Sequence, residues 1–409
     1  MANARSKRRL VFVEAEAIAS DFPLLSGKLP EFLKVPDLEG VLPASAIASR
    51  IYELRQLNVD DYIRQTVFPS EYPKRKNALD VVRQLGGEII YEVQEGPLYL
   101  AEINFSWQER PRRVLVLAQN RKSRNGVWMP RHHRRATELL SFYSDYGMPV
   151  VTFIDTPGAD AGEEANRENQ AHSISQLIAE VARLPVPTVS VVLGNGYSGG
   201  AIPLAATNVL LSVRDGVFNT IHPTGLAEIA YNYNLSWQEC AKYIGVSAFE
   251  LCQAGYLDGI INYSPMDSEP PRAVAAAIFS ALDRVEASAQ SFFRDPENQY
   301  FFQHYREQVL RALDRESSSA SGTMGRPRRY GGRGVFGAYY RFHRYLKMRR
   351  RLSSQTVIRY SRVDTMRLPK GELQVRLEKE RVARFNKWIE NPLEIRYDDV
   401  LNRRYRRWL

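Results

Sequence analysis

The residues of this chain that could do chemistry are mostly small ones, gathered in the glycine-rich stretch Gly194–Ala201. An apolar, β-branched run precedes it and a run of small residues follows, which predicts a turn between a buried strand and a helix. Glycines leave backbone N–H groups uncovered, and a helix start adds about half a positive charge. Such a turn suits a phosphate or a developing oxyanion. Close packing of helix on strand would require the same residues, so a purely structural turn remains an alternative.

Two further turns carry polar side chains. Asp155–Ala159 ends a second apolar run, and Asp155 could act as an acid or a base, although an Asp that caps its own turn is more common. His222–Gly225 ends a third strand, where His222 could touch a substrate or be an ordinary turn residue.

Metal chemistry is not indicated. His132 and His133 lie in the basic run Arg131–Arg135, and neighbours on a helix diverge by about 100°, so a solvated basic face is the better interpretation. The six His and two Cys show no metal-ligand spacing, and two cysteines exclude a disulfide framework. We therefore predict no metal site.

The elements that must position these turns alternate in type. The pattern predicts helices near 45–57, 78–85, 132–146, 226–232, 236–244 and 247–254, and strands at 98–105, 114–117, 150–154, 188–193, 209–213 and 217–221. This order predicts an α/β core, and α/β folds bind ligands at strand ends.

Composition divides the chain into four segments. We expect a helical N-terminal arm (1–87), the α/β core (88–265), a helical extension (266–316) and a basic linker with a C-terminal helical tail (317–409), including a helix at 371–390. The net charge is +10, but residues 301–409 hold 27 basic and 11 acidic residues. Arginines interleaved with aromatic residues are typical of nucleic-acid surfaces; we favour the alternative that the tail pairs with an acidic partner or with the chain's own body. No apolar run is long enough for a membrane span and no signal peptide is evident, so we expect a cytoplasmic protein.

The central segment resembles a known family. Met148–Ala159, the stretch through Ser198–Ala201 and Leu257–Ile261 are similar to the carboxyltransferase α subunit of bacterial acetyl-CoA carboxylase, in the crotonase-like superfamily. The similarity covers roughly 112–262, and Asn402–Tyr405 resembles the family's closing Asn-Arg-Arg-Tyr.

The resemblance implies a crotonase-like core of ββα units and a transferase active only with a β carboxyltransferase subunit of the zinc-ribbon type, as an α2β2 hetero-oligomer. Carboxybiotin, delivered by a biotin carboxyl carrier protein, would give its carboxyl group to acyl-CoA to form malonyl-CoA-type products. No cofactor would be bound covalently.

The resemblance also implies site residues. The oxyanion amides would be those of Gly200 and Ala201, with Gly199 shaping the turn. The pocket would be lined by three further groups of residues: Pro157, Gly158 and Ala159; Gly196, Tyr197 and Ser198; and His222, Pro223, Thr224 and Gly225.

Several of these positions depart from the family pattern. Tyr197 stands where the family has glycine, and His222 and Thr224 replace the Ser and Glu of its Ser-Pro-Glu-Gly loop. A divergent, non-catalytic paralogue, acting as a structural or regulatory subunit, is therefore a second hypothesis. A ring of Tyr197 that fills the pocket would support it. For the catalytic hypothesis we expect Gly200→Val to abolish turnover without unfolding the protein.

Overall fold

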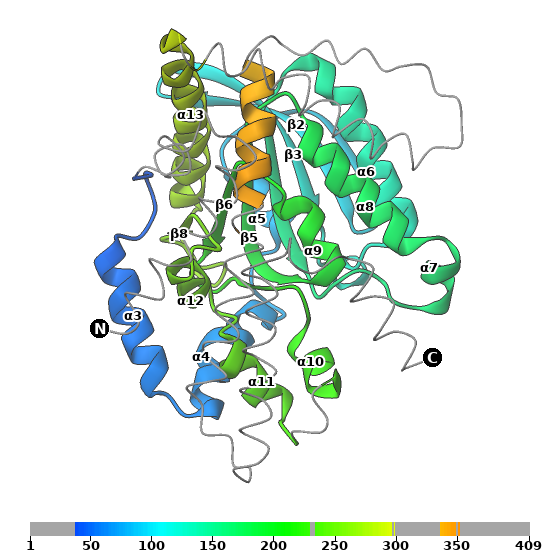
Figure 1. The fold of residues 1–409 in the computed structure, drawn as a ribbon, viewed down its shortest axis with the longest axis vertical. Coiled ribbons are helices and arrows are strands. Elements are labelled where there is room, and N and C mark those ends of the chain that lie inside the picture. The colour runs from blue at the N-terminus through cyan, green and yellow to red at the C-terminus, as the bar shows by residue number, and fades with distance from the viewer. Residues whose placement is uncertain (1–36, 230–233, 297, 299–335, 349–350, 352–409) are drawn as a thin grey trace, which may run out of the picture. The chain divides into compact units, whose positions relative to one another are not determined.

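The computed structural model describes residues 37–229, 234–296, 298, 336–348 and 351 (Figure 1). The first part of the predicted arm (1–36), the end of the helical extension (299–316), the linker, the predicted helix at 371–390 and Asn402–Tyr405 lie outside the described residues.

A mixed sheet forms the centre of the described chain. Its strands are β1 (Glu88–Glu95), β2 (Leu98–Trp107), β3 (Arg110–Gln119), β4 (Val150–Thr156), β5 (Thr188–Tyr197), β6 (Val209–Val213), β7 (Val217–Asn219) and β8 (Gly259–Ile261). The order is β1-β2-β3-β4-β5-β6-β8, and β7 pairs with the last residues of β5. The first three strands are antiparallel, and the pairs from β3 onward are parallel.

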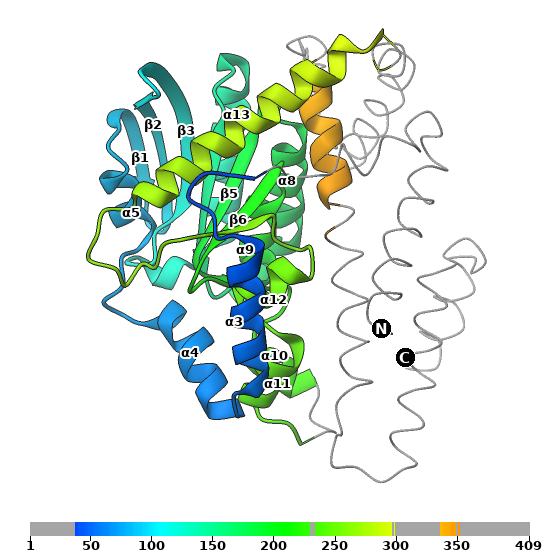
Figure 2. The same cartoon turned by 90° about the vertical axis from the view of Figure 1, so that its left-hand side faces the viewer.

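The parallel centre is buried on both faces, which explains its continuous apolar runs. Every residue of β4 and of β5 is buried. Helices α6 (Pro130–Tyr143), α8 (Gln170–Arg183) and α9 (Ser198–Ala205) cover one face, with the short α7 (Glu163–Arg167) before α8. The long α13 (Arg272–Arg294) lies on the other side of the sheet (Figures 1 and 2). The predicted α/β class is confirmed.

A second group of helices lies beyond the carboxyl ends of the parallel strands (Figure 1). It contains α3 (Ala44–Gln56), α4 (Val59–Glu71), α10 (Pro223–Ile229), α11 (Trp237–Ile244) and α12 (Ala248–Gln253). The short α5 (Ala78–Gln84) lies apart from this group, beside the sheet, where it contacts β3 and β4 (Figure 2). The predictions at 45–57 and 78–85 match α3 and α5. None of the helices in the described part of the chain is long and apolar enough to cross a bilayer.

Several elements were not predicted, β1 and β8 among them. β1 is exposed along almost its whole length, and β8 has only three residues. Residues 336–348 are helical although their composition indicated a basic tail. This helix packs on the end of α13, where the rings of Tyr339 and Phe292 lie 5.4 Å apart.

Candidate functional site

Two strand-end turns meet at one point of the sheet. β4 and β5 are parallel neighbours, so the turn Pro157–Ala159 and the start of α9 lie at the same edge. A Cβ on Gly200 would lie 2.5 Å from the carbonyl carbon of Gly158 and 2.7 Å from the amide nitrogen of Ala159. Two of the predicted groups of site residues are thus brought together. The same contact contradicts half of the expectation for Gly200→Val, because that side chain would collide with backbone and disturb the fold itself.

The start of α9 presents backbone donors. The helix begins directly after β5 and has no side-chain cap. Ser198 makes the bend with φ of 57°, a left-handed conformation uncommon outside glycine. The first N–H groups of a helix lack partners within it, so the amides of Gly199 and Gly200 remain for a ligand. The Ala201 amide is the first that can donate back along the helix, to the carbonyl of Tyr197. The helix dipole adds about half a positive charge there, which suits stabilisation of an oxyanion.

Ser198 carries a signal that sequence reasoning missed. Gly196, Ser198 and Gly200 have the Gly-x-Ser-x-Gly spacing of a nucleophile elbow, and the strand–turn–helix setting also matches. A serine nucleophile requires a base in hydrogen-bond reach. Within the described residues no histidine is hydrogen-bonded to the Ser198 hydroxyl. The geometry therefore favours the backbone amides over the hydroxyl as the reactive feature.

Two glycines of the stretch have packing roles. A Cβ on Gly196 would lie 2.7 Å from the ring of Phe218, and one on Gly199 would lie 2.7 Å from Ile174 of α8. Close packing, the structural alternative raised by the sequence, therefore applies to these two positions. It coexists with the uncapped helix start rather than replacing it.

Thr156 holds the Pro157–Ala159 turn in shape. Its hydroxyl donates to the Gly158 carbonyl at 2.8 Å and accepts from the Gly158 amide at 3.2 Å. Gly158 has φ of 147°, a conformation that side chains disfavour. The turn is thus fixed against α9.

Gln119, at the end of β3, joins both turns and was not predicted. Its side chain is fully buried; the amide nitrogen donates to the Gly200 carbonyl at 2.8 Å, and the oxygen accepts from the Asp155 amide at 3.0 Å. The Gly200 carbonyl belongs to the same peptide as the Ala201 N–H. Gln119 therefore orients one of the predicted oxyanion donors, and a hydrogen bond to a carbonyl polarises its amide.

Asp155 neither caps its own turn nor faces solvent. Its carboxylate is fully buried and receives two hydrogen bonds from the Arg75 guanidinium, at 2.9 and 2.5 Å. Arg75 also donates to the Ser70 carbonyl at 2.6 Å. The pair fastens the end of β4 to the segment after α4, so Asp155 has a structural partner rather than an acid–base role.

Tyr197 and His222, two departures from the family pattern, contact each other. Their ring centroids lie 4.6 Å apart, edge to face. Tyr197 is fully buried in the hydrophobic core, and burial raises the pKa of its phenol. Its hydroxyl has no hydrogen-bond partner among the described residues. The Tyr197 ring is thus accommodated in the core against His222.

His222 is the first residue of the third predicted group, His222–Gly225, and its ring bonds to Thr224. Its Nδ1 lies 2.7 Å from the Thr224 hydroxyl and accepts from the Thr224 amide at 3.3 Å, at the start of α10. Pro223 and Gly225 lie in the first turn of that helix. The Tyr197–His222 contact connects this group to the glycine turn.

The expectation of a solvated face for His132 and His133 is wrong. Their exposed fractions are 5% and 0%. The His133 ring lies edge-on to Trp128, with centroids 5.4 Å apart. Burial lowers the pKa of each histidine to about 4, so both are neutral at pH 7. The helical phase of α6 turns both toward the core despite the arginines around them.

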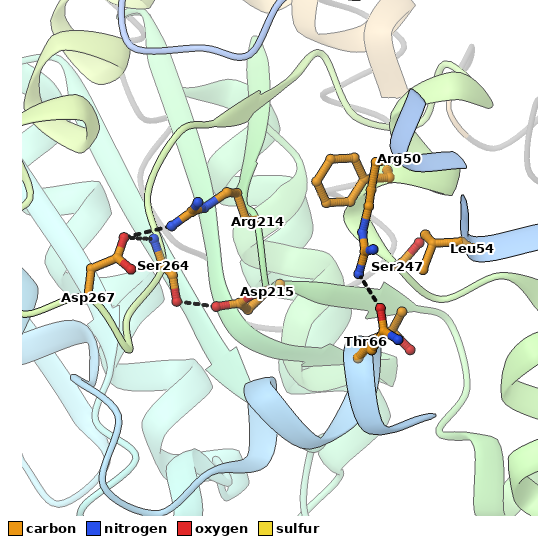
Figure 3. Close-up of a pocket in the computed structure, with 11 residues that line it drawn as sticks. Arg50, Leu54, Thr66, Arg214, Asp215, Ser247, Ser264 and Asp267 are labelled. Carbon is orange, nitrogen blue, oxygen red and sulfur yellow. Dashed lines mark hydrogen bonds and ion pairs between the residues drawn. The ribbon is translucent and has the colours of Figure 1, made fainter. Parts of the chain in front are cut away.

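A separate cavity of about 430 Å³ lies between α3, α4 and the turn from β6 to β7 (Figure 3). On one wall Arg214 pairs with Asp267 at 2.8 Å, and Ser264 donates to Asp215. On the other, Arg50 donates to Gln65 at 3.0 Å. None of the predicted site residues lines this cavity. In the described part of the chain, no three His, Cys, Asp or Glu side chains gather as a metal site would require.

Part of the chain is similar in sequence to a known protein family. The family model described as acetyl co-enzyme A carboxylase carboxyltransferase-like matches residues 116–303. The predicted resemblance is thereby confirmed for those residues.

Curated relatives of this carboxyltransferase-like chain carry matching names. The acetyl-coenzyme A carboxylase carboxyl transferase subunit alpha of Cyanidioschyzon merolae is 30% identical over 203 residues, which cover 47% of this chain and 65% of the relative. That of Rhodospirillum centenum is 28% identical over 271 residues, 61% of this chain and 82% of the relative. The subunits beta/alpha protein of Salinispora arenicola is 34% identical, but the match spans only 38% of this chain and 28% of that protein.

Solved structures similar to the carboxyltransferase-like chain include transcarboxylase 12S. That structure is 17% identical with a TM-score of 0.45, and the match covers 57% of this chain and 45% of that one. A chain of the Pseudomonas malonate decarboxylase MdcD-MdcE heterodimer is 16% identical with a TM-score of 0.40, over 54% of this chain and 95% of the other.

Proposed function

We propose that this chain is the α-type subunit of a biotin-dependent acyl-CoA carboxyltransferase whose substrate is a short acyl-CoA thioester, acetyl-CoA. The observation that carries the proposal is the uncapped start of α9, locked against Gly158 by backbone contact. The family match and the relatives' names support the same reaction class.

The chain's own groups would act mainly as positioned dipoles. The amides of Gly200 and Ala201 would stabilise negative charge on the ureido oxygen as the carboxyl group leaves. Gln119 would hold the Ala201 peptide in place, and Gly158 would close the opposite side. Carboxybiotin supplies the carboxyl group and, once decarboxylated, a base for the α-proton of acyl-CoA. This mechanism requires no side-chain acid or base. It is therefore compatible with the ion pair that Asp155 forms with Arg75.

The partners follow from the same proposal. A β carboxyltransferase subunit with a zinc ribbon would complete the site in an α2β2 assembly, and a biotin carboxyl carrier protein would deliver the carboxyl group in the cytoplasm. Pro157–Ala159, Gly196–Ser198 and His222–Gly225 would form the wall on the α side. Co-purification with these partners, read out by mass spectrometry, tests the assembly.

The activity test removes one N–H that the helix leaves unpaired. Replacement of Gly200 by glycolic acid turns the peptide bond before it into an ester, adds no side chain, and is expected to lower kcat by about 10²–10³-fold, as loss of one oxyanion donor does. The matched control replaces Ala44, the exposed first residue of α3, by lactic acid. Carboxyl transfer from malonyl-CoA to a biotin derivative, with the β subunit present, is the assay. An unchanged rate for the Gly200 ester contradicts the oxyanion assignment.

The non-catalytic alternative makes the opposite prediction. It requires a stable complex with a β subunit and no carboxyl transfer by the unmodified chain. The Tyr197 ring is buried in the core against His222, which supports a packing role for this departure from the family pattern.

A further inference from the structure

The basic segment at 336–351 contacts the core through its cations. Phe342 and Leu346 are buried, and Arg344 is fully buried as well. In both views the helix lies beside α13 and the end of α8 (Figures 1 and 2). We call residues 336–351 the C-terminal clip.

Arg344 caps the end of α8 and pairs with no carboxylate there. Its Nη1 donates to the carbonyls of Val181, Ala182 and Leu184 at 2.9–3.1 Å, and its Nη2 donates to that of Val186 at 2.7 Å. The last carbonyls of a helix lack partners within it. The guanidinium therefore replaces the water that would otherwise solvate this helix end.

Arg351 contacts the carboxyl end of α9 and the turn after it. Its Nη1 donates to the carbonyl of Ala205, the last residue of the helix, at 3.3 Å and to that of Thr207, two residues later, at 2.9 Å. Its Nη2 lies 2.6 Å from Asp258. Lys347 lies 2.9 Å from the other oxygen of Asp258. The Leu210 amide donates to the same carboxylate at 2.8 Å, which anchors it to β6.

The position of Arg351 bears on the candidate site because α9 is short. The helix has eight residues, with Gly199–Ala201 at one end and the Ala205 carbonyl, which accepts from Arg351, at the other. A cation at the carboxyl end stabilises the helix dipole, and a single rigid rod of this length transmits its position from one end to the other. No cation among the other described residues donates to this carbonyl or to that of Thr207.

We propose that the C-terminal clip positions the oxyanion turn, with Arg351 as the positioning residue that acts through α9. The predicted effect of Arg351 on kcat rests on the proposed function. The predicted effect of Arg351 on the order of α9 does not depend on any reaction.

The experiment compares Arg351→Gln with Arg64→Gln in the full chain. Arg64 lies on α4 with a side chain 70% exposed, so its loss removes a charge but no buried contact. In Arg351→Gln we expect hydrogen exchange to rise at least fivefold in peptides covering 198–206 and to stay unchanged in α6. In the complex with a β subunit we expect kcat to fall about tenfold with the KM for acyl-CoA within twofold. Arg64→Gln is expected to match the unmodified protein in both.

The outcomes separate the two proposals. Absence of carboxyl transfer in the unmodified complex overturns the proposed function, while exchange in 198–206 still decides the clip. Unchanged exchange in Arg351→Gln overturns the clip whatever the activity. Arg351→Lys keeps the cation without the planar fork and serves where glutamine disrupts folding. Intermediate exchange in that variant supports the proposal, and a uniform rise across α6 and α9 contradicts it, since that pattern means general destabilisation.

Discussion

Gln119 links two backbone groups whose separation the proposed chemistry depends on. Gln119→Met keeps the length of the side chain and leaves the Gly200 carbonyl and the Asp155 amide unsatisfied. We expect kcat to fall by roughly tenfold to a hundredfold through misplacement of the Ala201 N–H. The free energy of unfolding is expected to fall by about 1–3 kcal/mol, the usual cost of an unsatisfied buried polar group. Steady-state kinetics and urea unfolding measure the two effects.

The control for this prediction is Gln94→Met on the exposed strand β1. It changes the same atoms at a solvated position, so both quantities should stay near those of the unmodified protein. A Gln119→Met variant with full kcat would show that the Ala201 peptide keeps its orientation without this side chain.

His133 makes folding sensitive to mild acid. Burial holds its pKa at about 4, below the value near 6.5 of an unfolded histidine. The unfolded chain therefore binds the proton first, so stability is complete above about pH 6.5 and is lost as the pH falls toward 4. His133→Phe keeps a ring against Trp128 and removes this loss, on the order of 2–3 kcal/mol between pH 7 and 4.

Urea unfolding at a series of pH values tests this prediction. His172→Phe on α8 is the matched control, because His172 is exposed and its replacement should leave the slope unchanged. Parallel stability curves for His133→Phe and the unmodified protein between pH 6.5 and 4 would contradict it.

At the scale of elements, two glycines of the predicted site differ in how closely they are packed. Gly200 faces the backbone of Gly158, whereas a Cβ on Gly225 would meet only Ile221, at 3.5 Å. Gly200→Ala is therefore expected to lower the melting temperature by more than 5 °C, since backbone cannot yield as a side chain can. Gly225→Ala is expected to fold normally, and to raise a KM if Gly225 lines the pocket. Thermal unfolding of both variants is the measurement; equal melting temperatures would refute the close approach.

The buried strands could be predicted because each is an apolar run that ends at a turn containing glycine. The predicted strands at 150–154 and 188–193 correspond to β4 and β5, and the turns after them were recognised as site candidates. The exposed strand β1 was missed because it is not part of the buried core: nearly all of its side chains are exposed. Gln119 and Arg75 escaped notice because their partners, Gly200 and Asp155, are distant in the sequence and joined only by the tertiary fold.

At the scale of the whole molecule, the basic charge is not uniformly available to partners. Arg344, Lys347 and Arg351 are buried and engaged by the core. The preferred interpretation of the tail, pairing with the chain's own body, therefore holds for the described residues 336–348 and 351. These cations add to the net charge but offer nothing to a nucleic acid.

The same cluster makes the stability of the fold depend on pH in a second, more acidic range. Burial alone would raise the pKa of Asp258, but Lys347 and Arg351 hold that pKa well below its usual range. The stabilisation is complete above the unfolded value near 3.9 and is lost as the pH falls below it. Asp258→Asn is expected to cost about 3–5 kcal/mol at pH 7, since it leaves buried cations uncompensated, and to flatten the stability curve below pH 4.

Chemical unfolding at pH 7, 5, 4 and 3 measures this effect, with Asp60→Asn on the exposed surface of α4 as the control. An Asp258→Asn protein as stable as the unmodified one would contradict the role of this carboxylate.

The capping of α8 by Arg344 also has a consequence for biosynthesis. Arg344 lies 160 residues after Leu184, whose carbonyl it satisfies. At roughly 5–20 residues per second, a ribosome needs about 8–30 seconds to add that stretch. In the part of this interval that follows synthesis of β8, the nascent domain has all the strands of its sheet but lacks the cations that contact the ends of α8 and α9. Its final folding step therefore depends on a segment made late, and a translational pause or premature stop before codon 351 would leave the domain dependent on chaperones.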